Sequence, residues 1–396
     1  MTVTAPTRVV RHQPFEHITP NWFAAVMGTG IVATAAATLP VQFPALHVFA
    51  VAVWVIAATA LIVIGVAFVM HWIGHRDRAV AYARHPVMVQ FYGAPPMAML
   101  TVGAGAGLLG ADLLGSTAAT ALFATLWIAG TIAGLLTSVV VPYRMITASD
   151  HREVAALPAW LMPVVPPMVS ASTGALLLPH LPEGQWRLAL LCACYAMFGL
   201  SLILGMITLT LIYGRLLHGG LPPVDAAPTV WITLGLIGQS ITAANLLGSD
   251  ASMVFIGAQS SIAVGLHVFG IGYGLIMGGF GALMFGLATA LTVHAARRNL
   301  GFSLTWWSFT FPVGTCVTGA TALGQALNFG AVQALAVALY VLLLAAWFTV
   351  ATRTLRGVRR GELLYPGHRC ERTFTTLPPE SRKKNRRTPH SSLVIS

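Results

Sequence analysis

The chain has 396 residues, of which 56% are hydrophobic and only 8% are charged, and its formal net charge is +11. A soluble domain carries about 25% charged residues, so this composition excludes an ordinary soluble protein and indicates an integral membrane protein. Four scattered cysteines exclude a disulfide scaffold.

Apolar stretches long enough to cross a hydrocarbon core of about 30 Å recur from Pro20 to Ala351. They show no strand-like alternation, so we predict an all-α membrane protein. The first 18 residues carry Arg8, Arg11 and Glu16 without an apolar core, so no cleavable signal peptide is expected. Ten spans are predicted, at residues 20–40, 46–73, 87–108, 118–147, 158–180, 186–216, 228–248, 262–294, 304–325 and 330–353.

These spans divide the chain into three parts. Residues 1–18 form an N-terminal segment, residues 19–353 form the ten-helix transmembrane domain, and residues 354–396 form a basic, largely disordered tail. The tail contains "SRKKNRR" and follows a span directly, so we expect it to face anionic membrane lipids. No folded reader domain accompanies it, and a nucleic-acid partner is therefore not expected.

The basic residues predict the orientation of the chain. Of the 22 Lys and Arg residues, only Arg187 falls in the loops after the odd-numbered spans. Cytoplasmic loops are enriched in Lys and Arg, so both termini are predicted to lie in the cytoplasm, with the protein in the cell (inner) membrane.

A repeat of about 70 residues organises the transmembrane part. An aromatic residue marks the start of each odd-numbered span, and a glycine or proline motif follows it within four to seven residues. This pattern predicts five copies of a helical hairpin with quasi-five-fold symmetry, whose odd helices are loosened by these motifs. The aromatic residues are Trp22, Phe91, Trp160, Trp231 and Trp306.

The odd spans are predicted to surround a central pore, with the longer even spans facing lipid. Interrupted helices leave backbone groups without partners, which hydrocarbon does not tolerate but a water-filled axis does. The middle of the spans carries no Asp, Glu, Lys or Arg, so the pore is expected to be uncharged. Small polar residues such as Ser172, Thr173, Thr242 and Thr315 remain to line it.

Ten residues of the odd spans are the candidates for this pore lining. Serine, threonine and glycine are also the usual contacts between packed membrane helices, so each candidate has an alternative role in packing. The candidates are Thr29, Gln90, Pro95, Pro166, Ser170, Gln239, Ser240, Phe309, Thr310 and Pro312.

No cofactor, metal or catalytic centre is predicted. His71 and His75 have a spacing that could bind a metal, with His85 nearby, but adjacent arginines would repel a cation. The spans offer no nucleophile paired with a base and no second histidine to match His267, so an enzyme or a haem protein is not expected.

Four motifs in order resemble one transporter family. They are "TPNWFAAVMGTGIV", "LPAWLMPVVPP", "TVWITLGLIGQSITA" and "WWSFTFPVG", and the resemblance covers about residues 18 to 360. The chain is thereby identified as a member of the tellurite-resistance/dicarboxylate transporter family. This family includes malate permeases, sulfite efflux pumps and the plant slow anion channels.

The resemblance implies a fold and a gate. Family members are five-hairpin bundles, usually homotrimers with a pore in each subunit, and a phenylalanine of the ninth span closes that pore. The matching residue is Phe311, directly before Pro312. Without the resemblance, a packing aromatic would be the favoured interpretation of Phe311, as it is for most phenylalanines of the chain.

The predicted function is therefore an anion transporter or channel of the C4-dicarboxylate/malate transporter family. It would pass small anions, such as malate, sulfite, chloride or nitrate, through an uncharged pore gated by Phe311. A substrate with two carboxylates would normally require an arginine clamp, which the spans lack, so small monovalent anions are favoured. A sulfite efflux pump and a proton-coupled carrier of the same family remain the alternatives.

Overall fold

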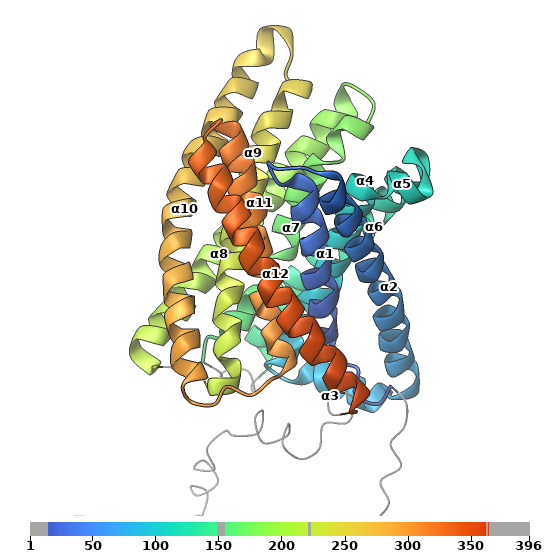
Figure 1. Cartoon of the computed structure of the whole chain (residues 1–396), viewed down its shortest axis with the longest axis vertical. Coiled ribbons are helices and arrows are strands. Elements are labelled where there is room, and N and C mark those ends of the chain that lie inside the picture. The colour runs from blue at the N-terminus through green and yellow to red at the C-terminus, as the bar shows by residue number, and fades with distance from the viewer. Residues whose placement is uncertain (1–14, 149–154, 221–222, 362, 364–396) are drawn as a thin grey trace, which may run out of the picture.

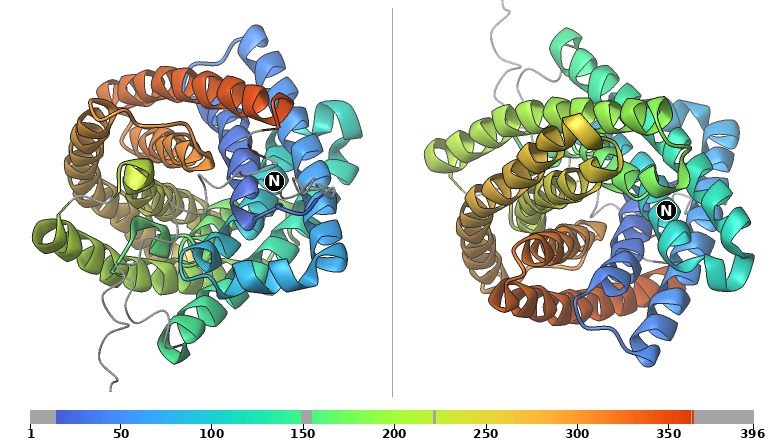
Figure 2. Two further views of the ribbon diagram at one scale, coloured as in Figure 1. Left: turned by 90° about the horizontal axis from the view of Figure 1, so that it is seen from below. Right: turned by 90° about the horizontal axis from the view of Figure 1, so that it is seen from above.

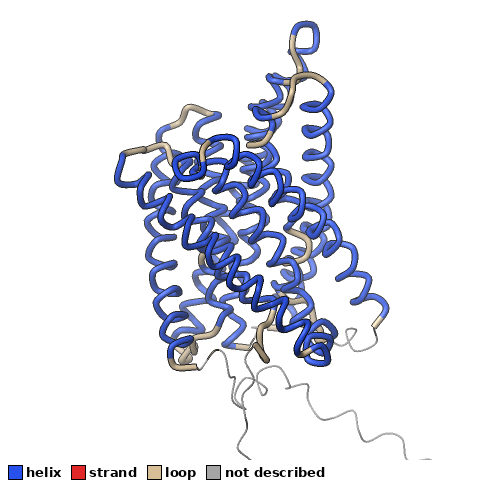
Figure 3. The backbone as a smooth tube through the Cα atoms, turned by 90° about the vertical axis from the view of Figure 1, so that its right-hand side faces the viewer, coloured by secondary structure: helices blue, strands red, loops and turns tan. Residues whose placement is uncertain are grey.

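The computed structural model describes residues 15–148, 155–220, 223–361 and 363. In this part of the chain all regular structure is helical and no strand occurs (Figure 3). Residues 1–14 and 364–396, which include most of the two predicted terminal segments, lie outside the described residues.

The described residues contain six helical segments that are long and apolar enough to cross a membrane, so this is a membrane protein. Five of them correspond to the even-numbered spans predicted above, and the sixth is the buried segment Ala226–Met253. The five long helices are α2 (Pro44–Gly74), α6 (Ser116–Thr147), α8 (Gln185–Gly219), α10 (Ser260–Ala296) and α12 (Gly330–Arg359).

The other main helices are shorter, and each is preceded by a stretch of 3-10 helix at one end of the bundle. These 3-10 segments contact one another in a closed order: η1 contacts η2, η2 contacts η4, η4 contacts η6, η6 contacts η9, and η9 contacts η1. The helices that follow them therefore start side by side. The five short helices are α1 (Phe23–Thr38), α4 (Ala94–Leu109), α7 (Pro166–Ala175), α9 (Ile232–Asp250) and α11 (Phe311–Ala326); their 3-10 segments are η1 (Pro20–Trp22), η2 (Met88–Gly93), η4 (Pro158–Leu161), η6 (Val224–Trp231) and η9 (Leu304–Phe309).

The short helices form a closed ring inside the long ones. Helix α1 contacts α4, α4 contacts α7, α7 contacts α9, α9 contacts α11, and α11 contacts α1 again. Each long helix packs on the short helix before it and on the next one, and α12 completes the circle on α1 (Figures 1 and 2). The apolar window of the α9 segment is 94% buried, whereas that of the α10 segment is 17% buried, so α10 exposes its apolar side chains outward.

In the short helices α4, α7 and α11 the prolines stand in the first turn instead of interrupting the helix. Pro166 is the first residue of α7, and Pro312 is the second residue of α11, which starts at Phe311. A proline in the first helical turn sacrifices no hydrogen bond, because the amide of that position has no partner within the helix. The change from 3-10 to α-helix therefore supplies the discontinuity in these spans.

The expectation that the glycine motifs loosen two helices was wrong. Helix α1 continues through Gly28 and Gly30, and α9 continues through Gly235 and Gly238. Gly238 instead permits close packing, since a Cβ placed there would lie 2.5 Å from the carbonyl carbon of Thr315 on α11. Small residues at such contacts let membrane helices approach closely.

Two short helices outside the predicted spans border the bundle. Helix α3 (Arg76–Arg84) follows α2. Within α3, the carbonyl oxygen of Ala83 accepts a 3.0 Å hydrogen bond from Arg144 near the end of α6. Helix α5 (Ala111–Leu114) lies at the other end, where Asp112 and the His47 ring are 2.6 Å apart. Charged side chains thus gather beyond the apolar helices.

The contact at Gly238 gives a test of the ring. We expect Gly238→Ala to destabilise the protein by about 1–3 kcal/mol, because the added methyl group overpacks a backbone-to-backbone contact between α9 and α11. The measurement is the melting temperature of the purified protein in detergent. Gly279→Ala is the matched control, since a Cβ at this α10 position meets no atom within 4 Å of the described structure. Equal melting of both variants would contradict the close contact.

Candidate functional site

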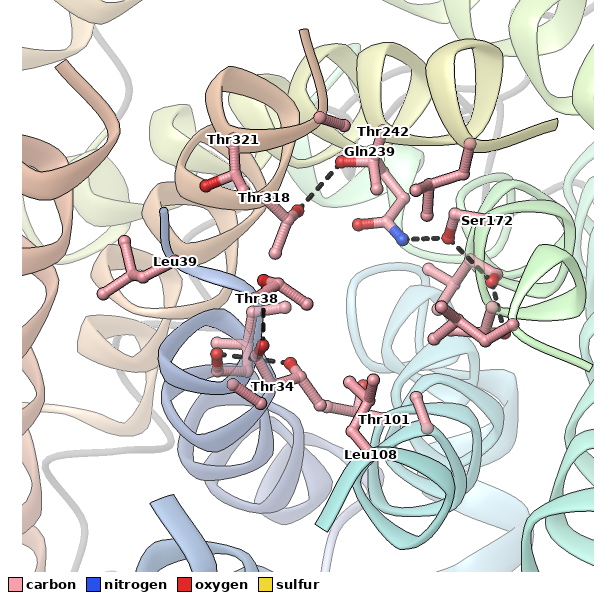
Figure 4. A pocket seen from close by; sticks show the side chains of 18 of the residues that line it. Thr34, Thr38, Leu39, Thr101, Leu108, Ser172, Gln239, Thr242, Thr318 and Thr321 are labelled. Carbon is pink, nitrogen blue, oxygen red and sulfur yellow. Dashed lines mark hydrogen bonds between the residues drawn. The ribbon is translucent and has the colours of Figure 1, made fainter. Parts of the chain in front are cut away.

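A cavity of about 360 Å³ lies inside the ring, toward the ends of the short helices. All five short helices contribute side chains to its wall, as Figure 4 shows in part. Its lining includes Thr34 and Thr38 of α1, Thr101 of α4, Ser172 and Thr173 of α7, Gln239 and Thr242 of α9, and Phe311, Thr318 and Thr321 of α11, with Gln42 and Gln325 also present.

The wall is polar but uncharged. Among the described residues that line the cavity there is no Asp, Glu, Lys, Arg or His, and the polar groups are the hydroxyls of serine and threonine and the amides of three glutamines. An ion in this cavity would therefore meet dipoles and no counter-charge. Such a wall can solvate an ion without trapping it at a fixed site.

Most of the hydroxyl groups give their protons to their own helices. Thr101 donates to the carbonyl oxygen of Met97 at 2.7 Å, and Thr38 donates to that of Thr34 at 3.0 Å. Thr173 does the same toward Val169 at 2.7 Å. Each of these hydroxyls has a single proton, so the lone pairs of its oxygen remain available to the cavity.

Side chains also connect the helices across the wall. Gln239 of α9 donates from Nε2 to Oγ of Ser172 on α7. The hydroxyls of Thr242 on α9 and Thr318 on α11 are 2.9 Å apart (Figure 4). These contacts link three neighbouring short helices on the side of the cavity that faces α9.

Phe311 forms the floor of the cavity. It is only 2% exposed, and its side chain lines both this cavity and a second one of about 20 Å³ on the other side. The second cavity reaches toward the 3-10 segments and includes Met27, Met97 and Trp307 in its lining. The Phe311 ring therefore lies between the two spaces.

Apart from Phe311, two of the residues that the sequence proposed for the pore border these cavities. Gln239 lines the large cavity, and Pro312 lines the small one. Ser172, Thr173 and Thr242, which the sequence grouped with them as small polar residues of the odd spans, also line the large cavity.

The remaining candidates contact neighbouring protein groups. The indole nitrogen of Trp347 on α12 donates to Thr29 at 3.1 Å, Thr131 on α6 donates to Ser170 at 2.9 Å, and Pro166 lies against Gly134 of α6. Their side chains thus lie on the faces of the short helices that meet the long helices. Gln90 donates to Pro86 and to the Met145 sulfur, Ser240 donates to Ile237, Thr310 donates to Trp307, and Pro95 lies in the first turn of α4.

Phe309 lies in a different environment from Phe311. Its ring packs edge-on against the rings of Trp231 and Trp306, at centroid distances of 5.7 Å in both cases. It ends the 3-10 segment η9, whereas Phe311 begins α11. Two phenylalanines separated by one residue are therefore directed to different places by the change of helix type.

Several lining residues were not found from the sequence, among them Thr34, Thr38, Thr101, Thr318 and Thr321. A usable signal exists in their spacing. Thr34 and Thr38 are four residues apart, and Thr318 and Thr321 are three apart, which places each pair on one face of its helix. The spacing alone does not show that these faces line the cavity, because the sequence does not give the side of each helix that points inward.

The comparisons with known proteins agree with this architecture. The model of the voltage-dependent anion channel family matches residues 17–355. The chain belongs to this family. The family match begins just before η1 and extends through most of α12, so it includes every helix of the cavity wall.

Relatives within the voltage-dependent anion channel family include proteins named as transporters. An uncharacterized transporter of Methanocaldococcus jannaschii is 29% identical over 355 residues, which are 89% of this chain and 96% of the relative. A sulfite efflux pump of Arthroderma otae is 28% identical, over 85% of this chain and 89% of the pump. A putative malic acid transport protein of Schizosaccharomyces pombe is 23% identical, over 92% and 84% of the two chains.

The wall of the cavity can be tested by thiol labelling. In a variant whose native cysteines are replaced by alanine, we expect Thr318→Cys to react with a small charged thiol reagent, because Thr318 lines the cavity. Thr131→Cys is the control: Thr131 of α6 is 9% exposed, as Thr318 is, but its hydroxyl donates to Ser170 at 2.9 Å and it lies outside the cavity wall. Modification is measured by mass spectrometry. Equal labelling at both positions would contradict this assignment of the wall.

Proposed function

We propose that this protein passes small anions across the membrane through the ring of short helices, and that Phe311 closes the path. In this account the anion enters the large cavity, meets the Phe311 ring at its floor, and leaves through the space lined by Met27 and Met97. Movement of one aromatic ring would connect the two spaces, and a hydrophobic constriction of this kind excludes both water and ions.

The observation that carries the proposal is the neutral cavity ending on Phe311. A fixed positive charge would hold an anion tightly, and a fixed negative charge would repel it. The wall described above has neither, so an anion can enter and leave. This arrangement suits a path for ions better than a storage or catalytic site.

One helix end supports a preference for anions. Helix α11 begins at Phe311, which borders the cavity. The first turn of a helix carries a partial positive charge from its unpaired amide groups, and it stabilises a nearby anion. Helix α7 adds no free amide, because it begins with Pro166 and Pro167, and the amides of Met168 and Val169 both donate to the carbonyl of Val165.

The wall favours small anions of single charge. A dicarboxylate would gain most from a bidentate arginine, and no arginine occurs among the described lining residues. Sulfite is supported by three fungal relatives that are named as sulfite efflux pumps and are 28% identical to this chain. Malate is supported more weakly, since the malic acid transport relative is 23% identical.

The arrangement in the membrane completes the proposal. We infer ten crossings, formed by five helical hairpins with quasi-five-fold symmetry, because each long helix packs on its own short helix and on the next one around the ring. The positive-inside pattern supports an inner-membrane protein with both termini in the cytoplasm, and the basic tail would then meet anionic lipids. A homotrimer is expected from the family resemblance.

The gate is tested by shortening one side chain. Phe311→Ala removes the ring between the two cavities, so we expect anion current through purified protein in planar bilayers to rise by at least about tenfold, with chloride and nitrate as the permeant ions. The wild-type protein should show a small current.

Phe309→Ala is the matched control for the gate. It removes the same ring two residues earlier, from the group formed with Trp231 and Trp306, and should leave the anion current near the wild-type level. Equal currents for the two variants would contradict the gate. If neither variant conducts while liposomes accumulate sulfite under a proton gradient, a coupled carrier replaces the channel.

A further inference from the structure

Gln239 lies in the cavity wall between its floor and its outer part. One helical turn earlier, Gly235 faces Pro312 beside the floor, and one turn later Thr242 pairs with Thr318. The side chain is only 4% exposed and belongs to the wall of the large cavity. An ion that moves between the outer cavity and Phe311 must pass this amide.

The contacts of Ser172 fix the orientation of the amide. The Ser172 hydroxyl donates its single proton to the carbonyl oxygen of Val169 at 3.0 Å, so toward Gln239 it can only accept. The NH2 group of Gln239 must therefore face Ser172, as the hydrogen bond from Nε2 to Oγ shows. The amide oxygen Oε1 consequently points away from Ser172, toward the side of Thr318 and Thr38 (Figure 4).

The amide oxygen has no hydrogen-bond partner in the part of the chain that the structure describes, although it is buried. The nearest hydroxyls on α9 and α11, those of Thr242 and Thr318, bond to each other at 2.9 Å, and the second proton of this pair has a backbone acceptor at Gly238 or Thr315. A buried acceptor left without a partner costs free energy, so a donor is to be expected from whatever occupies the cavity.

We propose that the cavity binds singly charged oxyanions that still carry a proton, and that Gln239 Oε1 accepts the hydrogen bond from that O–H group. This inference rests on the proposed anion path. The negative charge is stabilised by the first turn of α11 at Phe311, and the proton is recognised by Gln239. Ser172 is the positioning residue, because it holds the amide in the required orientation.

The selection for a proton rests on Gln239 and not on the rest of the wall. The hydroxyls of Thr38, Thr101 and Thr173 have given their protons to backbone carbonyls. The buried hydroxyl of Thr321 has no partner among the described residues, so it can donate to an anion with or without a proton. An anion with one O–H group can in addition use the free acceptor at Gln239, which therefore selects the protonated class, to which hydrogencarbonate, hydrogensulfite and hydrogen dicarboxylates belong.

A comparison of hydrogencarbonate with nitrate tests the role of the proton on the anion. Both are planar, singly charged anions with three oxygens around a central atom, and the relevant difference is the O–H group of hydrogencarbonate. Binding is measured on the purified full-length protein from the rise in melting temperature with anion concentration, which gives an apparent dissociation constant for each anion. Fluxes of the same two anions are measured in liposomes.

We expect the wild-type protein to bind hydrogencarbonate about tenfold more tightly than nitrate, the value of one hydrogen bond to a charged ligand. Gln239→Met keeps the length of the side chain but removes its acceptor, and should reduce this ratio to about one through weaker hydrogencarbonate binding. Gln90→Met is the matched control. Gln90 is fully buried and its amide oxygen also has no described partner, but it lies outside the cavity, so the ratio should persist.

Ser172→Ala is the second variant and decides the question if Gln239→Met does not fold. Loss of the Ser172 hydroxyl frees the amide, so the ratio should fall below the wild-type value. An unchanged ratio in the Gln239 or Ser172 variant, or equal wild-type binding of the two anions, would overturn the inference. A wild-type protein that binds both anions but passes neither would instead overturn the proposed function, while the binding ratio still decides the role of Gln239.

Discussion

The structure depends on where the hydroxyl protons of its wall go. A threonine or serine inside a bilayer must find an acceptor, and on these helices the carbonyl three or four residues earlier provides one, as for Thr101 with Met97. The short helices can therefore carry many hydroxyls whose protons are satisfied within the helix, and among the described lining residues the buried hydroxyl of Thr321 is left to donate to an occupant. The result is a space inside a membrane protein whose wall is polar and uncharged.

The second constraint is the change from 3-10 to α-helix at the start of each short helix. It brings the 3-10 segments together at one end and sets the rotation of the α-helix that follows. On α11 this change separates Phe309, which packs among tryptophans, from Phe311, which faces the axis. Pro312 is accommodated because it stands in the first turn, and Gly238 lets α9 approach the same helix closely.

The sequence predicted the helical membrane architecture well, because apolar length and charge distribution determine it directly. The aromatic positions of the repeat also located the 3-10 segments that precede the short helices. The wall of the cavity was predicted poorly: Gln239 faces it, but Thr29 and Ser170 bond to α12 and α6 instead. On a helix buried on all sides, composition shows no amphipathic face, so the inward direction depends on packing between helices. The resemblance of the "WWSFTFPVG" motif, and no physical signal, singled out Phe311.

Different anion specificities within one family can be understood from this arrangement. In the proposed path, the ring and the floor would provide a general route, while single side chains on the wall, such as Gln239, would determine which anion is favoured. Substitution of a wall residue whose hydroxyl bonds only within its own helix, such as Thr101, is expected to change specificity at little cost to the fold. The long helices and their apolar outer faces stay the same.

The most direct test of the central claim is to place a fixed charge on the wall. With Phe311→Ala as the background, Thr318→Lys and Thr318→Glu add opposite charges to a position inside the large cavity. If anions pass through this cavity, the lysine variant should carry a larger chloride current than the background and the glutamate variant a smaller one, and the difference should shrink as salt rises. Equal currents in the two variants would show that anions do not pass through the cavity.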